Sequence, residues 1–174
     1  ADFTFQREDI TAYEGGFKGD FGDRVRVNAA AYYYDFANKQ VTFATNPLIA
    51  TERAIVNTDD ELYGFEVDGT FVLNENFTAR GSYAYIDGTA GDTVNPLNPA
   101  DVRSYPELQG TPKNSYMMAI DYNGKLGNKD LFGNLTFSHK DDILAIPESA
   151  LRLPAIDLVS GRIGMSFDTS NGAK

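Results

Sequence analysis

Residues 63–85 of the 174-residue chain read YGFEVDGTFVLNENFTARGSYAY. Apolar, aromatic or small residues alternate with polar ones on both sides of the Asn74-Glu75-Asn76 segment. Successive side chains of a strand point to opposite faces of a sheet, so this pattern predicts two antiparallel strands joined by a tight turn. One face is expected to carry Tyr63, Phe65, Val67, Gly69, Phe71, Phe77, Ala79, Gly81, Tyr83 and Tyr85, and the other Gly64, Glu66, Asp68, Thr70, Thr78, Arg80 and Ser82.

The same alternation recurs in seven segments, which predicts seven strands. They cover residues 10–18, 24–43, 63–71, 77–85, 115–123, 131–140 and 158–167. Short connections at 19–23, 74–76 and 124–130 alternate with long ones near 44–60, 88–114 and 141–156. An up-and-down antiparallel meander places all short turns at one end and all long loops at the other, as in bacterial outer-membrane barrels.

Strand length and composition favour a membrane barrel over a soluble sheet. Strands of about ten or more residues exceed the soluble mode of about 5 to 6 and approach the roughly 9 to 11 residues of a tilted membrane strand. Gly and Ala stand among the aromatics of the apolar face, which suits a smooth wall against lipid but leaves gaps in a packed interior. Aromatic residues gather near strand ends, as at the two membrane interfaces of a barrel. The alternative is a soluble all-β binding or adhesion domain that uses its long loops for recognition.

The predicted fold class is all-β: an antiparallel up-and-down meander of about seven strands that forms an incomplete segment of a transmembrane β-barrel. Single-chain bacterial barrels have an even number of strands and at least about eight, so seven strands would leave two open edges in lipid. We therefore interpret residues 1–174 as one partial barrel domain that belongs to a larger barrel.

Composition excludes several partners and protein classes. The chain has 15 Lys and Arg against 25 Asp and Glu, and its net charge of -10 disfavours nucleic acid. It has no cysteine, which excludes disulfides and thiolate metal sites. No apolar run approaches the roughly 18 residues of a membrane-spanning helix, and residue 1 does not open a signal peptide. A helical membrane protein is therefore excluded.

No arrangement of residues predicts an enzyme, a cofactor or a metal site. His139 is the single histidine and is expected in a strand next to a loop, which does not favour a catalytic triad. Asp59-Asp60-Glu61 and Asp141-Asp142 lack the EF-hand spacing that gathers about 6 to 8 oxygens around Ca²⁺. We therefore interpret both clusters as solvated loop charge.

Four short motifs resemble the barrel of TonB-dependent receptors and stand in the order found in that family. The first is Tyr13-Glu14-Gly15-Gly16-Phe17-Lys18, and the second is Val25-Arg26-Val27-Asn28-Ala29-Ala30-Ala31-Tyr32-Tyr33-Tyr34-Asp35-Phe36 followed by Gln40-Val41. The third is Tyr63-Gly64-Phe65-Glu66-Val67, and the fourth is Thr111-Pro112-Lys113-Asn114-Ser115. The resemblance covers nearly the whole chain.

This resemblance implies a receptor of the Gram-negative outer membrane that captures a scarce nutrient and imports it by ligand-gated transport energised through TonB. Such receptors have an N-terminal plug domain, earlier barrel strands and final barrel strands, none of which is expected within this chain. The implied partners are outer-membrane lipid, the receptor's own plug, TonB and a small-molecule nutrient. Cargoes in the family include ferric siderophores, haem, cobalamin and oligosaccharides, and an iron chelate is the default expectation.

Two sets of residues are expected to meet the plug or the cargo. Polar residues in phase with one another are expected to point into the lumen toward the plug: Arg24, Arg26, Glu66, Asp68, Arg80 and Asp121. Recognition concentrates on loops held by a rigid scaffold, and the segment 88–114 is the longest connection. It is expected to present Arg103 to an anionic chelate, Tyr105 as an aromatic face, and Gln109. The alternative is that this loop only shields the barrel mouth.

Overall fold

The computed structural model describes residues 6–46, 49, 51–105, 107–146 and 150–166. The strands in these residues are β1 (Asp9–Phe21), β2 (Val25–Ala44), β3 (Arg53–Val72), β4 (Phe77–Asn95), β5 (Asn98–Tyr105), β6 (Asn114–Leu126), β7 (Lys129–Lys140), β8 (Ile143–Ile146), β9 (Leu151–Leu153) and β10 (Ile156–Met165). Among the same residues we find no helix with the length and apolar character needed to cross a membrane.

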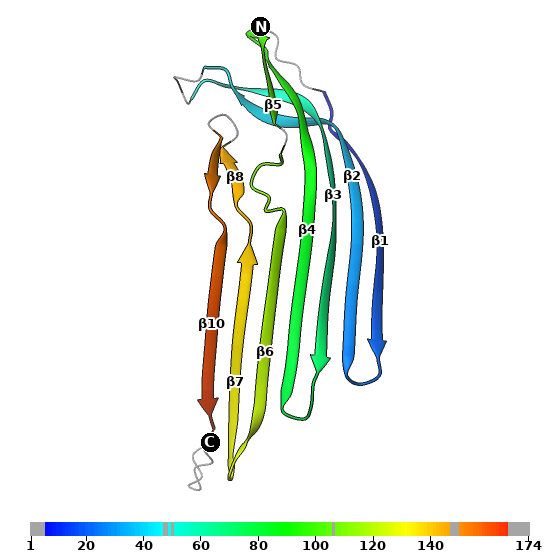
Figure 1. The fold of residues 1–174 in the computed structure, drawn as a ribbon. Helices are drawn as coiled ribbons and strands as arrows, with labels where there is room; N and C mark the ends of the chain where they lie inside the picture. Colours follow the sequence, from blue (N-terminus) through cyan, green and yellow to red (C-terminus); the bar gives the residue numbers. More distant parts are fainter. Residues whose placement is uncertain (1–5, 47–48, 50, 106, 147–149, 167–174) are drawn as a thin grey trace, which may run out of the picture.

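Seven strands form one sheet in the order β1-β2-β3-β4-β6-β7-β10, and β5 pairs with the outer part of β4. All pairings between neighbours in this order are antiparallel. β8 and β9 form a separate two-stranded hairpin. The described sheet does not close on itself, and β1 and β10 are its two edges (Figure 1). The predicted all-β meander, an open segment of a barrel wall, is confirmed.

Turns and long connections lie at opposite ends of this sheet. The turns that join β1 to β2, β3 to β4 and β6 to β7 lie together at the lower end of Figure 1, which we call the turn end. Gly22 and Gly127 in two of these turns have φ angles of 62° and 66°, a left-handed conformation that glycine adopts without a steric cost. The remaining connections lie at the opposite end, which we call the loop end (Figure 1).

The register gives the sheet two chemically distinct faces. One row of opposed residues crosses all seven strands as Gly19, Val27, Gly69, Gly81, Met118, Phe137 and Val159. The next row points to the other side and consists of Asp20, Arg26, Thr70, Arg80, Ala119, Thr136 and Ser160. We call the two sides the apolar face and the polar face. Predicted alternation and observed register therefore agree over the middle of the sheet.

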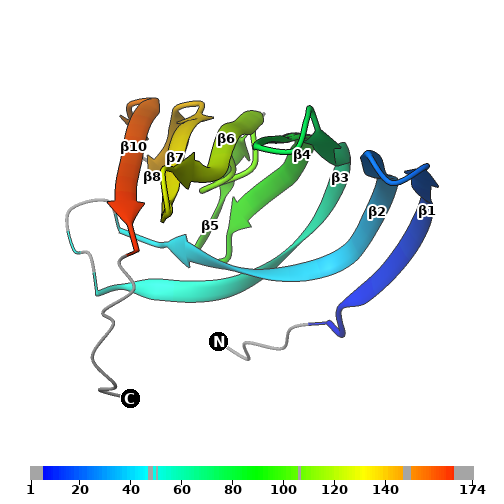
Figure 2. The same cartoon turned by 90° about the horizontal axis from the view of Figure 1, so that it is seen from below.

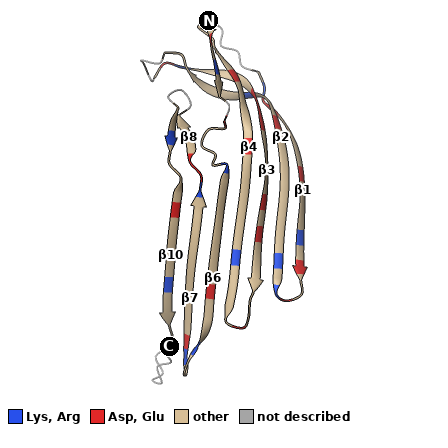
Figure 3. Ribbon diagram, in the orientation of Figure 1, with Lys and Arg blue, Asp and Glu red and all other residues tan. Residues whose placement is uncertain are grey.

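The described residues leave the apolar face uncovered. Phe17, Met118 and Ile163 on this face are 53%, 63% and 79% exposed. Most of each strand also lacks charged residues, as Figure 3 shows. The sheet is curved, and the outer ends of β2 and β3 bend across it (Figure 2). A wide, uncharged and uncovered surface of this kind fits a wall that lies against lipid.

The predicted loops are wider than the observed ones. β3 already begins at Arg53, β4 continues to Asn95, and the segment predicted as loop 141–156 holds β8 and β9. Residues 88–95 read GTAGDTVN, which combines low strand propensity with no clear alternation. They are nevertheless extended, because Gly88 and Thr89 pair with β3 and residues 90–95 pair with β5. Most of the predicted loop 88–114 is thus a β-hairpin, which is a correction to the sequence interpretation.

Candidate functional site

A β-bulge lies near the loop end of β2. The pairing with β3 shifts between Phe36 and Lys39, so that two residues of β2 lie opposite Asp59 alone. Asn38 has a φ angle of 58°, its N–H donates to Asp59 Oδ1 at 2.9 Å, and its carbonyl accepts from Asn57 Nδ2 at 2.5 Å. Asparagine tolerates this left-handed conformation better than most residues do. Two side chains of β3 therefore hold the bulge in place.

The bulge changes which residues of β2 share the polar face. Before it, Phe36 lies opposite Asp60, and after it Lys39 lies opposite Thr58. Residues 60 and 58 of β3 point to the same side, so Phe36 and Lys39 do so as well. Sequence alternation suggested one uninterrupted phase as far as Phe43. The extra residue instead turns Phe43 to the polar face.

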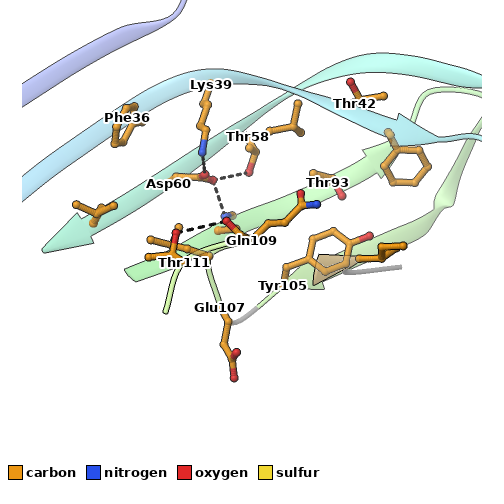
Figure 4. Close-up of a pocket in the computed structure, with 18 of the residues that line it drawn as sticks. Phe36, Lys39, Thr42, Thr58, Asp60, Thr93, Tyr105, Glu107, Gln109 and Thr111 are labelled. Carbon is orange, nitrogen blue, oxygen red and sulfur yellow. Dashed lines mark hydrogen bonds and ion pairs between the residues drawn. The ribbon is translucent and has the colours of Figure 1, made fainter. Parts of the chain in front are cut away.

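A cavity of about 740 Å³ lies at the loop end, on the side of the polar face. This volume falls within the range of about 300–1,000 Å³ that is common for small-molecule sites. Its walls come from the outer parts of β2, β3 and β4, from Tyr105 of β5, from residues 107–111 and from Ile146 of β8. Figure 4 shows Lys39 and Thr58 of the lining pointing toward Asp60.

Asp60 is the buried polar centre of this cavity, and the residue is only 2% exposed. Its carboxylate accepts hydrogen bonds from Lys39 Nζ at 2.6 Å and Gly91 N at 3.1 Å, with a longer contact to Thr58 Oγ1 at 3.5 Å (Figure 4). A buried carboxylate requires such partners because its loss of hydration is costly. The interpretation of Asp60 as solvated loop charge is therefore wrong, since β3 carries it beneath the bulge.

Of the three predicted ligand residues, Tyr105 and Gln109 line the cavity, whereas Arg103 lies outside the lining. The Arg103 guanidinium lies over the Phe43 ring, 4.1 Å from its centre. It donates from Nε and Nη2 to the Asp101 carboxylate at 3.2 and 3.0 Å. These hydrogen bonds hold the pKa of Asp101 below its ordinary value. Arg103 thus neutralises a carboxylate of its own strand and covers one side of Phe43.

The charged residues of the lining are also engaged within the protein. Lys39 pairs with Asp60, and Glu107 Oε2 accepts from Arg152 Nη1 at 2.7 Å. Glu107 points away from the group around Asp60 in Figure 4. Arg53, the other lining cation, has a protein partner as well. Two cations and two anions line the cavity, so its formal charge is zero.

The residues predicted to face the lumen share the polar face. Arg26, Glu66, Asp68, Arg80 and Asp121 lie on it within strands, and Arg24 lies in the turn before β2. Arg80 Nη2 lies 2.7 Å from Asp121 Oδ2, and Arg26 Nε lies 2.7 Å from Asp20 Oδ1. Asp60 in the cavity belongs to the same face. The cavity and these charged residues therefore lie on one face of the sheet.

His139 lies between two carboxylates. Its Nδ1 is 2.6 Å from Asp157 Oδ1 and its Nε2 is 3.1 Å from Asp141 Oδ1, while its ring stacks on Tyr116 with centres 4.8 Å apart. These contacts join β6, β7 and β10 near the loop end. Within the described part of the chain, no three His, Asp or Glu side chains gather closely enough to hold a metal ion.

The curved, two-faced antiparallel sheet defines a class of protein, the wall of a transmembrane β-barrel. The family model described as TonB dependent receptor-like, beta-barrel matches residues 2–170. Because the match spans nearly the whole chain, the chain belongs to this family of outer-membrane receptors, which is not an enzyme family. The resemblance carried by the four sequence motifs is thereby confirmed. No curated protein matches the sequence.

Proposed function

We propose that this chain forms part of the wall of an outer-membrane receptor that captures a scarce nutrient and imports it with energy delivered through TonB. The observation that carries the proposal is the position of the cavity. It lies at the loop end and on the polar face, so a ligand bound there would be next to the surface that leads along the strands. Capture at one end and passage along one face are the two steps that an importer requires.

The apolar face supports a membrane location for this receptor. Soluble monomers rarely expose contiguous apolar patches beyond a few hundred Å². Here large apolar side chains remain exposed on β1, β6 and β10, as Phe17, Met118 and Ile163 illustrate. The alternative of a soluble binding or adhesion domain would leave this surface in water. The outer membrane of a Gram-negative bacterium is therefore the proposed location.

The polar face is the proposed contact surface for the plug domain. Arg26, Glu66, Asp68 and Arg80 point to this side, and the ion pair of Arg80 with Asp121 leaves Arg80 about half exposed, at 49%. A guanidinium has five N–H donors, so a carboxylate partner does not use all of them. Such groups would exchange hydrogen bonds with plug side chains that move during transport.

The full-length receptor provides the direct test of this proposal. It is expressed in a Gram-negative host whose own nutrient receptors are deleted, and uptake of a radiolabelled nutrient is measured with and without TonB. Ferric siderophores are the first cargo to test, because they are the default that the family resemblance suggests. We expect uptake that disappears in the TonB-deleted host, with membrane insertion unchanged. Equal uptake in both hosts would contradict an energised receptor and leave a passive pore.

A further inference from the structure

The cavity at the loop end is poorly suited to a negatively charged ligand. Its lining carries no net charge, and Lys39 and Glu107 are each held in an ion pair with another side chain of the protein. An anionic chelate would have to compete with Asp60 for Lys39, or with the protein partner of Arg53, to gain a cation. The Asp60 carboxylate, buried in the cavity wall, would meanwhile repel that anion.

Arg103, the cation predicted to attract an anion, does not change this conclusion. Both of its donating nitrogens are within hydrogen-bond distance of Asp101, and its guanidinium is packed on Phe43. Its side chain is only 19% exposed. Removing it from these contacts would expose Phe43 and leave Asp101 without its strongest partner.

Uncharged hydrogen-bonding groups are available in the lining. Gln109 donates from Nε2 to the carbonyl of Ala145 at 2.8 Å, so its Oε1 and second N–H are not used by this bond. Thr111 Oγ1 makes only a long contact, 3.4 Å, to the carbonyl of Gln109. Gln109 is exposed and Thr111 is half-buried, so a ligand in the cavity reaches both groups. Each of them bonds hydroxyl groups in either direction, as donor or as acceptor.

Aromatic rings stand in the same lining. Phe36 and Phe43 come from β2 on the two sides of the bulge, and Tyr105 comes from β5. Tyr105 is half-buried, so part of its ring surface faces the cavity. Sugar rings have apolar C–H faces with hydroxyl groups around their edges, which matches flat aromatic surfaces flanked by hydroxyl and amide groups.

We propose that this cavity binds an uncharged, hydroxyl-rich ligand of the carbohydrate class, with a sugar ring on Tyr105 and hydroxyl groups bonded to Gln109 and Thr111. This inference rests on the proposed function, in which the cavity receives the cargo. It selects one of the cargo classes that the family allows, and it replaces the iron chelate of the default expectation.

The test uses the purified full-length receptor and isothermal titration calorimetry. The uncharged probes are maltohexaose, cellohexaose and xylohexaose, and the anionic probes are ferric citrate and ferric enterobactin. We expect at least one saccharide to bind with an affinity that salt does not change, because no ion pair forms. Tyr105→Ala should weaken this binding about tenfold, since it removes the stacking surface, whereas Tyr105→Phe should retain most of it.

Two further variants separate loss of binding from loss of folding. Gln109→Ala alters an exposed side chain and should weaken saccharide binding by about threefold to tenfold through one lost hydrogen bond. Leu97→Ala is the control. Leu97 lies on the β4–β5 hairpin that also carries Tyr105, is 62% exposed and does not line the cavity. The substitution should leave the affinity unchanged.

The outcomes distinguish this inference from the proposed function. Binding of ferric citrate or ferric enterobactin alone would overturn the carbohydrate assignment and leave the receptor function standing. Saccharide binding that survives both Tyr105→Ala and Gln109→Ala would place the ligand elsewhere and overturn the site. Failure of all three saccharides to bind would overturn the carbohydrate assignment, whereas uptake that does not depend on TonB would overturn the proposed receptor function.

Discussion

From the turn end to the bulge, β2 and β3 pair without interruption, from Val25 opposite Phe71 to Phe36 opposite Asp60. Beyond the bulge the same two strands bend, and β4 pairs with β5 through further irregularities. The irregular half carries the 740 Å³ cavity, whereas two hollows lined by described residues of the regular half are smaller, at about 460 and 380 Å³. Departures from the regular ladder, and not the ladder itself, therefore shape the binding region of this wall.

Two glycines of β4 differ in how closely the chain is packed around them. A Cβ atom added at Gly81, in the regular half of β4, would have its nearest neighbour at 3.8 Å. A Cβ atom added at Gly88, nearer the loop end of the same strand, would lie 2.2 Å from the carbonyl oxygen of Glu61. The space beside the backbone of β4 is therefore open at Gly81 and filled at Gly88.

The largest effect is expected when a charge is placed on the apolar face of the regular half. Val67→Arg should destabilise the receptor by about 2–4 kcal/mol, the usual cost of an arginine on the lipid face near the middle of a barrel. The matched control is Ser82→Arg on the polar face, opposite Asp68, which should cost much less. Equilibrium unfolding of the full-length receptor in lipid vesicles measures both. Equal costs would mean that the two faces are assigned wrongly.

A smaller effect is expected from the two glycines of β4. Gly88→Ala should destabilise the receptor by about 1–3 kcal/mol, because the backbone of β3 must move to admit the methyl group. Gly81→Ala should be neutral or stabilise it by up to about 1 kcal/mol, since the methyl group meets no obstacle and restricts the unfolded chain. The same unfolding measurement applies. A larger loss at Gly81 than at Gly88 would contradict the difference in packing between the two glycines.

The smallest effect concerns acid and the β4–β5 hairpin. Asp101 has a lowered pKa in the folded protein, mainly through Arg103, so its stabilising contribution is present above the unfolded pKa of about 3.9. That contribution is lost as the pH falls through the folded pKa. Hydrogen-exchange protection of β5, corrected for intrinsic rates, should therefore decrease below about pH 4. Asp101→Asn should remove this dependence, and an unchanged pH profile in that variant would show that another group is responsible.

Alternation with a period of two residues predicted the regular half correctly, because no bulge interrupts the pairing of β2, β3 and β4 there. Val27, Gly69 and Gly81 stand on one face in the sequence pattern and in the structure alike. The bulge was missed because its left-handed Asn38 depends on hydrogen bonds from β3, which no local pattern of β2 displays. Residues 98–105 fall within a predicted loop for a related reason, since pairing with β4, and not propensity, makes them a strand.

The candidate site was predicted only in part. Tyr105 and Gln109, which the sequence predicts as ligand residues of the longest connection, line the cavity, and their binding role stays a prediction. Asp60 was missed, since a cluster of three acidic residues usually stands in solvent and only the fold around it reveals burial. The sequence contains enough to predict the ion pair of Arg103 with Asp101. The two residues are two positions apart, so their side chains point to the same side of an extended strand.

The bulge at Asn38 adds one residue to β2, so every later side chain of this strand points to the opposite side from the one that regular alternation predicts. Upstream of it the odd-numbered residues of β2 face outward, and downstream of it the odd-numbered residues face the cavity. When the hydropathy of residues 39–44 is compared with that of a strand without a bulge, the odd-numbered and even-numbered positions must therefore be exchanged. A designer who transplants this segment onto a strand without a bulge must shift it by one position, or Phe43 will point into lipid.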